Sequence, residues 1–255
     1  MTRQEIEQRI EALGPWFYPF DFGDGVRTTS NVPPHVTDIF ETRRQMLERV
    51  VTAHFAGRLP QIRCLDIGCH EGFYSFAMAG LGAGRITGLD VREANLSKAR
   101  FAAERLGHSN IAFQQGNIEE LDPASLGASE LVLFLGVLYH LENPMRALRN
   151  LSAITSELCV IETQVVDEVE GEVEWGAREW TRPYQGVLAL IDEGGEFYAD
   201  NTETGHSPVA TCPSPKGLTF MLKQAGFQRV EFVEPPAGAY EQHARGKRVV
   251  CAAYK

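Results

Sequence analysis

The residues best suited to bind a ligand form the sequence LDIGCHEG at positions 65–72. They follow a short apolar run and include two glycines, Gly68 and Gly72. Glycine lets the backbone approach a ligand closely, and the first turn of a following helix presents N–H groups to that ligand. The sequence therefore predicts a strand, a tight turn and a helix that together hold a small molecule. A strand and turn without a ligand stay open as the alternative.

A carboxylate at Asp90 narrows the type of ligand. Asp90 ends a second strand-like run about 20 residues after Gly68, where a doubly wound α/β domain binds the hydroxyls of a ribose. The turn contains neither G-x-G-x-x-G nor G-x-x-x-x-G-K-[ST], the patterns that hold pyrophosphate and triphosphate. Asp66 would repel phosphate but can accept hydrogen bonds from an ammonium group, directly or through water. A nucleoside with an amino-acid tail, S-adenosylmethionine, fits these residues.

The turn resembles the first motif of the class I S-adenosylmethionine-dependent methyltransferases, which reads roughly [DE]-x-G-x-G-x-G. Asp66, Gly68 and Gly72 match its first and last elements, and His70 stands at its middle glycine. The resemblance implies that S-adenosylmethionine is the cofactor and that Cys69 and His70 also lie beside it. A dinucleotide cofactor is a distant alternative.

Residues after the next three strands are expected to complete the cofactor site. Asn117 stands where this family often has an acidic residue that hydrogen-bonds the adenine amino group, and its side-chain oxygen can accept that bond. Ile118 can pack on the adenine face, and Val91 can flank the nucleoside. Gly136 should lie near the methionine end. A role for Asn117 in the turn alone stays open.

Tyr139, His140 and Glu162 are the candidate catalytic residues. They follow the fourth and fifth strands, at the edge where an open parallel sheet forms its ligand crevice. Tyr139 or His140 can position the methyl acceptor, and His140 can also take its proton near neutral pH. Glu162 can be a base, an acceptor-binding group or an exposed loop residue, and local packing stays open for His140. No metal site is expected, because no cluster has metal-ligand spacing.

Alternating strand-like and helix-like segments would position these residues. Strands are expected at 63–67, 86–90, 111–115, 131–135 and 158–161, and helices at 73–79, 95–106 and 143–151, the last capped by Asn143. Such alternation predicts a parallel sheet with right-handed crossovers. A helix at 216–225 and strands at 229–233 and 248–253 follow, and the resemblance implies an antiparallel terminal hairpin. The fold class is therefore α/β, a doubly wound Rossmann-like sheet of seven mostly parallel strands.

The chain divides into a cap and a methyltransferase domain. Residues 1–58 are expected to form the cap, with helices at 2–13 and 38–55 and an aromatic segment at 16–22. Residues 59–255 form the domain, in which 163–213 are acidic, turn-rich and without clean periodicity, as in a substrate-covering insertion. Aromatic residues at 16–22, 175–184 and 197–198 can wall an acceptor pocket or belong to the core.

Charge and composition limit the partners. The 255 residues include 24 Lys+Arg and 34 Asp+Glu, a formal net charge of −10, whereas nucleic-acid binders generally present a basic face. We therefore expect a small-molecule acceptor rather than DNA or tRNA, although Arg43-Arg44 and residues 245–248 leave a local basic patch open. The five cysteines lack C-x-x-C spacing, and no signal peptide or membrane-length apolar run occurs. These features predict a cytoplasmic protein with free thiols and no membrane partner, either monomeric or homodimeric.

A second resemblance narrows the reaction. Residues 136–148 (GVLYHLENPMRAL), Ile161-Glu162-Thr163 and the helix near 213–227 are similar to bacterial enzymes that carboxymethylate the wobble uridine of tRNA, and to related small-molecule methyltransferases. The resemblance implies that a tRNA enzyme of this kind needs a carboxylated cofactor and a basic surface. The net charge of −10 does not suggest a basic surface. Our main expectation is therefore an O- or N-methyltransferase that transfers a methyl group in line to a small polar or aromatic molecule. The alternatives are a tRNA uridine-modifying (carboxy)methyltransferase and a non-catalytic adenosylmethionine-binding protein.

Overall fold

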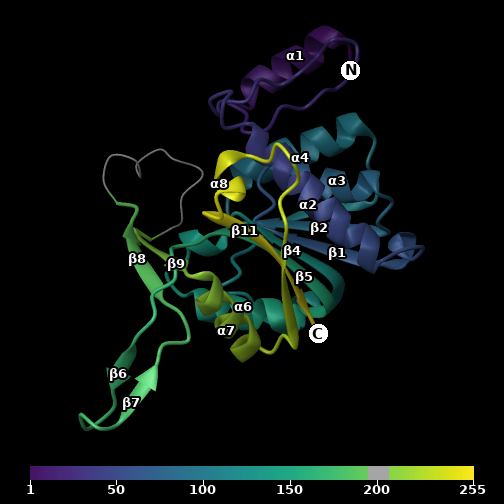
Figure 1. Ribbon diagram of the computed structural model, residues 1–255. Coiled ribbons are helices and arrows are strands. Elements are labelled where there is room, and N and C mark those ends of the chain that lie inside the picture. The colour runs from purple at the N-terminus through teal and green to yellow at the C-terminus, as the bar shows by residue number, and fades with distance from the viewer. Residues whose placement is uncertain (195–206) are drawn as a thin grey trace.

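A seven-stranded sheet forms the centre of the computed structural model, which describes residues 1–194 and 207–255 (Figure 1). Its order is β10-β11-β5-β4-β1-β2-β3. These strands are β1 (Arg63–Ile67), β2 (Arg85–Asp90), β3 (Ile111–Gln115), β4 (Ser129–Leu135), β5 (Thr155–Gln164), β10 (Arg229–Val233) and β11 (Arg248–Tyr254). Strands β1 to β5 run parallel, and β11 is antiparallel to both β5 and β10. The predicted fold class is confirmed.

Helices cover both faces of the sheet (Figure 1). One layer contains α2 (Asp38–His54), α3 (Phe73–Gly80) and α4 (Glu93–Leu106), and the other contains α6 (Pro144–Ile154) and α7 (Pro215–Ala225). In β4, Leu131 and Leu133 pack into the first layer, while Val132 and Phe134 pack into the second. Successive side chains of a strand point to opposite faces, so a strand buried on both sides is apolar throughout.

Two details of the predicted elements differ from the structure. The Asn143 side chain makes no capping bond to α6; its backbone N–H instead donates to Oε1 of Glu119 at 2.9 Å. The connection between β10 and β11, expected to form an antiparallel hairpin, also contains the short α8 (Glu241–Ala244). Ser214 caps α7, because its hydroxyl accepts from the Gly217 N–H at 3.3 Å.

The N-terminal segment begins with α1 (Arg3–Ala12), which lies at the end of the molecule far from the hairpin at 172–183 (Figure 1). Thr2 and Glu5 form a capping box at its start. The aromatic residues that follow pack as core, since Trp16, Tyr18 and Phe20 are all buried. They therefore anchor the segment against the sheet domain.

The described part of the insertion forms two hairpins. The first pairs β6 (Glu172–Glu174) with β7 (Thr181–Pro183), and the second pairs β8 (Leu188–Asp192) with β9 (Val209–Pro213). The first hairpin projects away from the sheet, and its Trp175 and Trp180 are exposed (Figure 1). The second returns to the domain, where the Thr211 hydroxyl donates to the Leu141 carbonyl at 2.9 Å. Phe197 and Tyr198 lie outside the described residues.

All five cysteines are buried free thiols. Among residues 1–194 and 207–255, no helix has the length and apolar character needed to cross a membrane.

Candidate functional site

A cavity of about 370 Å³ lies at the carboxyl ends of β1 to β4. This size is ordinary for a small-molecule site. The predicted site residues that line it are Gly68, His70, Asp90, Val91, Asn117, Ile118, Gly136 and His140. The predicted residues outside its lining are Asp66, Cys69, Gly72, Tyr139 and Glu162. The structure therefore brings most of the expected cofactor residues together and places two of the three expected catalytic residues behind the cavity wall.

In the turn after β1, Gly68 and Gly72 stand at positions where a side chain would clash with its neighbours. Gly68 has φ 72°, and a Cβ at this position would lie 2.3 Å from Cγ2 of Val137. Its N–H donates to the Leu89 carbonyl at 2.7 Å, which ties the turn to β2. Gly72, with φ 85°, precedes α3, and a Cβ there would meet the Phe113 ring at 2.9 Å. Gly68 thus shapes the cavity wall, whereas Gly72 allows tight packing behind it.

Asp66 is buried at the base of the turn. Its Oδ2 accepts from the Ser75 hydroxyl at 2.6 Å. Burial raises the pKa of Asp66 to about 7, and the Ser75 hydrogen bond offsets only part of that effect. Because Asp66 does not line the cavity, its expected contact with an ammonium group would have to be indirect.

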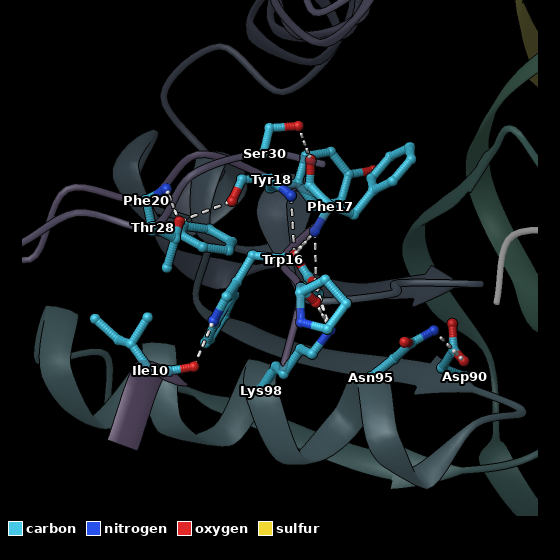
Figure 2. Close-up of polar contacts among 12 residues, drawn as sticks. Ile10, Trp16, Phe17, Tyr18, Phe20, Thr28, Ser30, Asp90, Asn95 and Lys98 are labelled. Carbon is cyan, nitrogen blue, oxygen red and sulfur yellow. Dashed lines mark hydrogen bonds and ion pairs between the residues drawn. The ribbon is translucent and has the colours of Figure 1, made fainter. Parts of the chain in front are cut away.

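Asp90 lines the cavity, and hydrogen bonds hold its carboxylate, of which Figure 2 shows the one from Asn95. Its carboxylate accepts from the backbone N–H groups of His70 and Arg92, each at 2.9 Å, and from Nδ2 of Asn95 at 3.4 Å. Burial raises its pKa, and these hydrogen bonds act in the opposite direction. Asn117 is also preorganised, because its Oδ1 accepts from the Glu119 N–H at 3.0 Å. Each side chain keeps acceptor capacity for a ligand.

His70 supplies the clearest sign that the cavity is built for a ligand. It has φ 51°, so it stands in a left-handed conformation that glycine adopts more easily. Both ring nitrogens are buried and have no hydrogen-bond partner among the described residues. Burial lowers the pKa of His70 to about 3, so the ring is neutral. A buried polar group without a partner is costly, and a ligand in the adjoining cavity can supply that partner.

Glu71, the next residue, fastens the N-terminal segment to the turn. Its buried carboxylate accepts from the N–H groups of Phe17, at 2.9 and 3.0 Å, and Tyr18, at 2.9 Å. It also pairs with Nζ of Lys98 at 3.0 Å. Figure 2 shows Lys98 reaching from α4 to this segment, where Nζ also donates to the Pro15 carbonyl. The Phe17 ring lies 4.9 Å from that of His70, so the anchored segment covers one side of the His70 ring.

Glu71→Gln should loosen this segment. Lys98 would lose its buried anion, and the N–H groups of Phe17 and Tyr18 would lose a charged acceptor, at a cost of roughly 1–3 kcal/mol. Urea unfolding measures the loss, and hydrogen exchange of the two amides shows where it arises. Glu104→Gln, an exposed change on α4, should leave both unchanged. Unaltered exchange at Phe17 and Tyr18 in Glu71→Gln would contradict the anchor.

Glu162 lies at the centre of a second buried cluster, which we call the arginine cluster: Arg43, Glu162, His243, Arg248 and Tyr139. Glu162 is within β5, not in an exposed loop, and pairs with Nη2 of Arg43 at 3.0 Å and Nη1 of Arg248 at 3.1 Å. Nε2 of His243 lies 3.4 Å from its Oε1. Burial alone would raise the pKa of Glu162, but the two guanidinium groups hold it well below its usual range. Glu162 is therefore a fixed anion and a poor general base.

The arginine cluster has more positive than negative charge. Two guanidinium groups share one carboxylate, and the Tyr139 hydroxyl accepts from both terminal nitrogens of Arg248 at 3.2 Å. Nε of Arg43 is buried without a hydrogen-bond partner in the described part of the chain. A Cβ at Gly136 would lie 3.2 Å from Nη1 of Arg43, so the cluster adjoins the cavity at Gly136.

His140 has a partner that the sequence did not reveal. Its Nδ1 lies 2.9 and 3.0 Å from the two carboxylate oxygens of Glu193, which follows β8 in the insertion. Sequence reasoning also missed the roles of Glu71, Arg43 and Arg248. The basic groups at 43–44 and 245–248 were a usable signal, but they suggested a surface patch, whereas Arg43 and Arg248 are both buried.

Several known proteins are similar to this chain. A family model described as "Methyltransferase domain" matches residues 59–205. A protein of Ectopseudomonas mendocina named tRNA U34 carboxymethyltransferase is 36% identical over 91% of this chain and 62% of its own length. A protein of Methylococcus capsulatus with the same name is 30% identical over 96% of this chain and 66% of its own length. Another, from Actinobacillus succinogenes, is 30% identical over 99% of this chain and 77% of its own length. The chain thus spans about two thirds of the length of several such relatives.

Solved structures share the fold. The N-terminal domain of EvdMO1, crystallised in the presence of SAH and D-fucose, superposes with a TM-score of 0.74 and 23% identity, covering 100% of this chain and 97% of the other. Magnesium protoporphyrin IX methyltransferase from Synechocystis PCC 6803, with bound SAH, superposes with a TM-score of 0.55 and 19% identity. The match covers 99% of this chain and 94% of the other. At these identities the likeness concerns the fold alone.

The relatives correct one expectation. The net charge suggested a small-molecule acceptor and no nucleic acid, and that prediction is wrong, because the similar proteins carry tRNA in their names. Net charge sums over the whole chain and does not describe the field at one surface.

Proposed function

Because the chain belongs to the S-adenosylmethionine-dependent methyltransferase family, we propose that it transfers a carboxymethyl group from a carboxylated S-adenosylmethionine to a uridine of tRNA. The proposal goes beyond family membership in two respects. It specifies the transferred group, which the arginine cluster supports, and it specifies the acceptor, which the names of the relatives support.

The cavity residues fit the cofactor. Asp90 can accept hydrogen bonds from the ribose hydroxyls, and Asn117 and Ile118 can bind the adenine, all from the lining of one cavity. The amino-acid tail of the cofactor can provide a hydrogen-bond partner for the buried ring nitrogens of neutral His70. When bound, the cofactor supplies a carbon activated by attachment to a sulfonium. The chain's residues then need to orient the acceptor toward that carbon and exclude water.

The surplus positive charge of the arginine cluster is the observation that carries the choice of transferred group. Arg43 lies next to Gly136, where the methionine end of the cofactor is expected, and Arg43 and Arg248 share the single carboxylate of Glu162. A carboxylate on the transferred carbon would balance the remaining charge and offer an acceptor to Nε of Arg43. An ordinary methyl group would leave that charge unbalanced in a buried site.

The names of the relatives support the acceptor. Proteins 30–36% identical to this chain are named for position U34 of tRNA. A base in a single-stranded loop can be turned outward into a protein pocket, which a base inside a duplex cannot do as cheaply. A uridine in such a loop therefore suits a cavity that opens at the edge of the sheet.

The cofactor preference should depend on Arg248. We expect the wild-type protein to bind carboxylated S-adenosylmethionine at least about 10-fold more tightly than S-adenosylmethionine, a difference of about 1.4 kcal/mol. Arg248→Met leaves the Arg43–Glu162 pair but removes the surplus charge, so the preference should fall to within roughly 2-fold. Isothermal titration calorimetry with both cofactors measures this.

A neighbouring arginine provides the control. Arg245 is exposed and pairs with Glu241 at 3.9 Å, so Arg245→Met should keep the wild-type preference. Equal affinity of the wild-type protein for the two cofactors would overturn the carboxymethyl proposal. It would leave the family assignment unaffected.

A further inference from the structure

We propose that Glu193 is a positioning residue that holds His140 as the general base for the acceptor, an inference that rests on the proposed function. Both oxygens of Glu193 lie within 3.0 Å of Nδ1 of His140, and each side chain is 18% exposed. His140 also lines the cavity, as Gly136 does. The pair therefore joins the cofactor cavity to the insertion.

The contact fixes which ring nitrogen carries the proton. A carboxylate only accepts hydrogen bonds, so the hydrogen between the two groups belongs to Nδ1 of His140. Nε2 of the neutral ring then keeps its lone pair and can accept a proton. A carboxylate partner also fixes the orientation of an imidazole and stabilises the imidazolium that forms on protonation.

The fold brings the two residues together from distant parts of the chain. His140 ends the short helix η2 (Leu138–His140), directly beyond β4 at the rim of the sheet. Glu193 follows β8, and its N–H donates to the Pro208 carbonyl at 2.9 Å. Thr211 in β9 anchors the same hairpin to Leu141, the residue after His140. The second hairpin of the insertion thus delivers Glu193 to the site.

Other charged and titratable groups surround the pair. The ring of Tyr139 on the same helix lies 4.1 Å from the His140 ring, centroid to centroid, at an angle of 47°, and the Tyr139 hydroxyl accepts from Arg248. The remaining such groups that line the cavity with His140 are His70, Asp90, Arg92, Glu119, Glu120, Glu142 and Arg146. Glu193 is distinguished from them by its direct hydrogen bonds to the ring.

The reaction step balances with His140 as the base. The acceptor oxygen or nitrogen forms a bond to the transferred carbon as the carbon–sulfur bond breaks. The electrons of that bond remain on sulfur, which becomes a neutral thioether. The acceptor's proton passes to Nε2 of His140, and the Glu193 carboxylate balances the imidazolium charge.

The protonation state of the ring can be observed without any activity. Two-dimensional ¹H–¹⁵N spectra of histidine-labelled protein distinguish Nδ1–H from Nε2–H, and His140→Ala identifies the signal among the seven histidines. At a pH where the ring is neutral, we expect the Nδ1–H form in the wild type and a shift toward Nε2–H in Glu193→Ala. An Nε2–H ring in the wild type, or no change in Glu193→Ala, would overturn the proposal.

Enzyme kinetics distinguish a positioning role of Glu193 from a role in folding. With bulk bacterial tRNA and carboxylated cofactor, Glu193→Gln should lower kcat about 10- to 100-fold and leave KM within about 2-fold. In a His140→Ala background, the Glu193 substitution should cause no further loss, because both act through one ring. Glu172→Gln, the same change on β6, should behave as wild type.

The spectra and the kinetics together show which of the two proposals fails, the proposed function or the role of Glu193. Inactive wild-type protein with the predicted Nδ1–H form would contradict the proposed function and leave the pair intact. Active protein in which Glu193→Gln keeps the wild-type kcat would contradict the role of Glu193.

Discussion

Glu162→Ala is expected to destabilise the protein by about 3–5 kcal/mol, because it leaves two buried guanidinium groups without their shared anion. Arg43 and Arg248 come from α2 and β11, so their repulsion would act on a helix and a strand that pack beside β5. The loss is large relative to the 5–15 kcal/mol that stabilises a typical domain. We therefore expect a substantial unfolded fraction at moderate urea concentrations.

Denaturant unfolding at neutral pH measures this effect, and a second glutamate on β5 gives the control. Glu157 is partly exposed and pairs with Arg58 at 2.9 Å, so Glu157→Ala should lose no more than about 1 kcal/mol. Similar losses for the two variants would contradict the account of the arginine cluster. Because the pKa of Glu162 is depressed on folding, its contribution should be complete above the unfolded pKa and be lost only in strong acid.

Gly68→Ala should abolish most cofactor binding. The added methyl group would lie 2.3 Å from Cγ2 of Val137, and φ 72° is unfavourable for alanine. Either the turn or Val137 must move, and both line the cavity. We expect at least about a 50-fold loss of affinity for S-adenosylhomocysteine, equivalent to about 2.3 kcal/mol. Isothermal titration calorimetry gives the affinity, and circular dichroism reports whether the variant is folded.

Two further variants separate the clash from a general effect of alanine. Gly80→Ala, at the end of α3, adds a methyl group that meets no atom within 4 Å beyond its chain neighbours and its own helix backbone, so this variant should bind the cofactor normally. Gly68→Ala combined with Val137→Ala should recover part of the affinity, because the second change removes the obstructing methyl. Wild-type affinity in Gly68→Ala alone would show that the cofactor does not lie against this turn.

The fold and the cofactor could be predicted because their signals are local in the sequence. Each strand from β1 to β4 contains apolar residues, and the residues at its carboxyl end reach the cavity, as Gly68 follows β1 and Asp90 ends β2. A glycine turn and a carboxylate at that separation need no knowledge of distant contacts. The predicted cofactor, S-adenosylmethionine, agrees with the family to which the chain belongs.

The interior of the site could not be predicted because distant segments form it. Arg43, Glu162 and Arg248 meet only because β11 pairs with β5 and α2 packs beside them. The sequence shows their charges but not their burial, so basic residues of the core resembled a surface patch. Glu193 likewise reaches His140 only through the second hairpin, whose place follows from the contact between β9 and Leu141.

The acceptor was predicted wrongly for a related reason. A net charge of −10 includes acidic residues of the projecting insertion, such as Glu168, Glu170 and Glu172, which lie along its first hairpin or just before it. Electrostatic attraction to RNA depends on the field near the docking surface, not on the sum over the chain.

Nucleoside mass spectrometry of tRNA tests the central claim most directly. Bulk bacterial tRNA is incubated with the protein and equal concentrations of S-adenosylmethionine and its carboxylated form, then digested to nucleosides. We predict that a carboxymethyl group appears on a uridine nucleoside, that methyl transfer is at least about 10-fold lower, and that Arg248→Met reduces this preference. Methyl transfer equal to or greater than carboxymethyl transfer, or no modification of tRNA with either cofactor, would contradict the account.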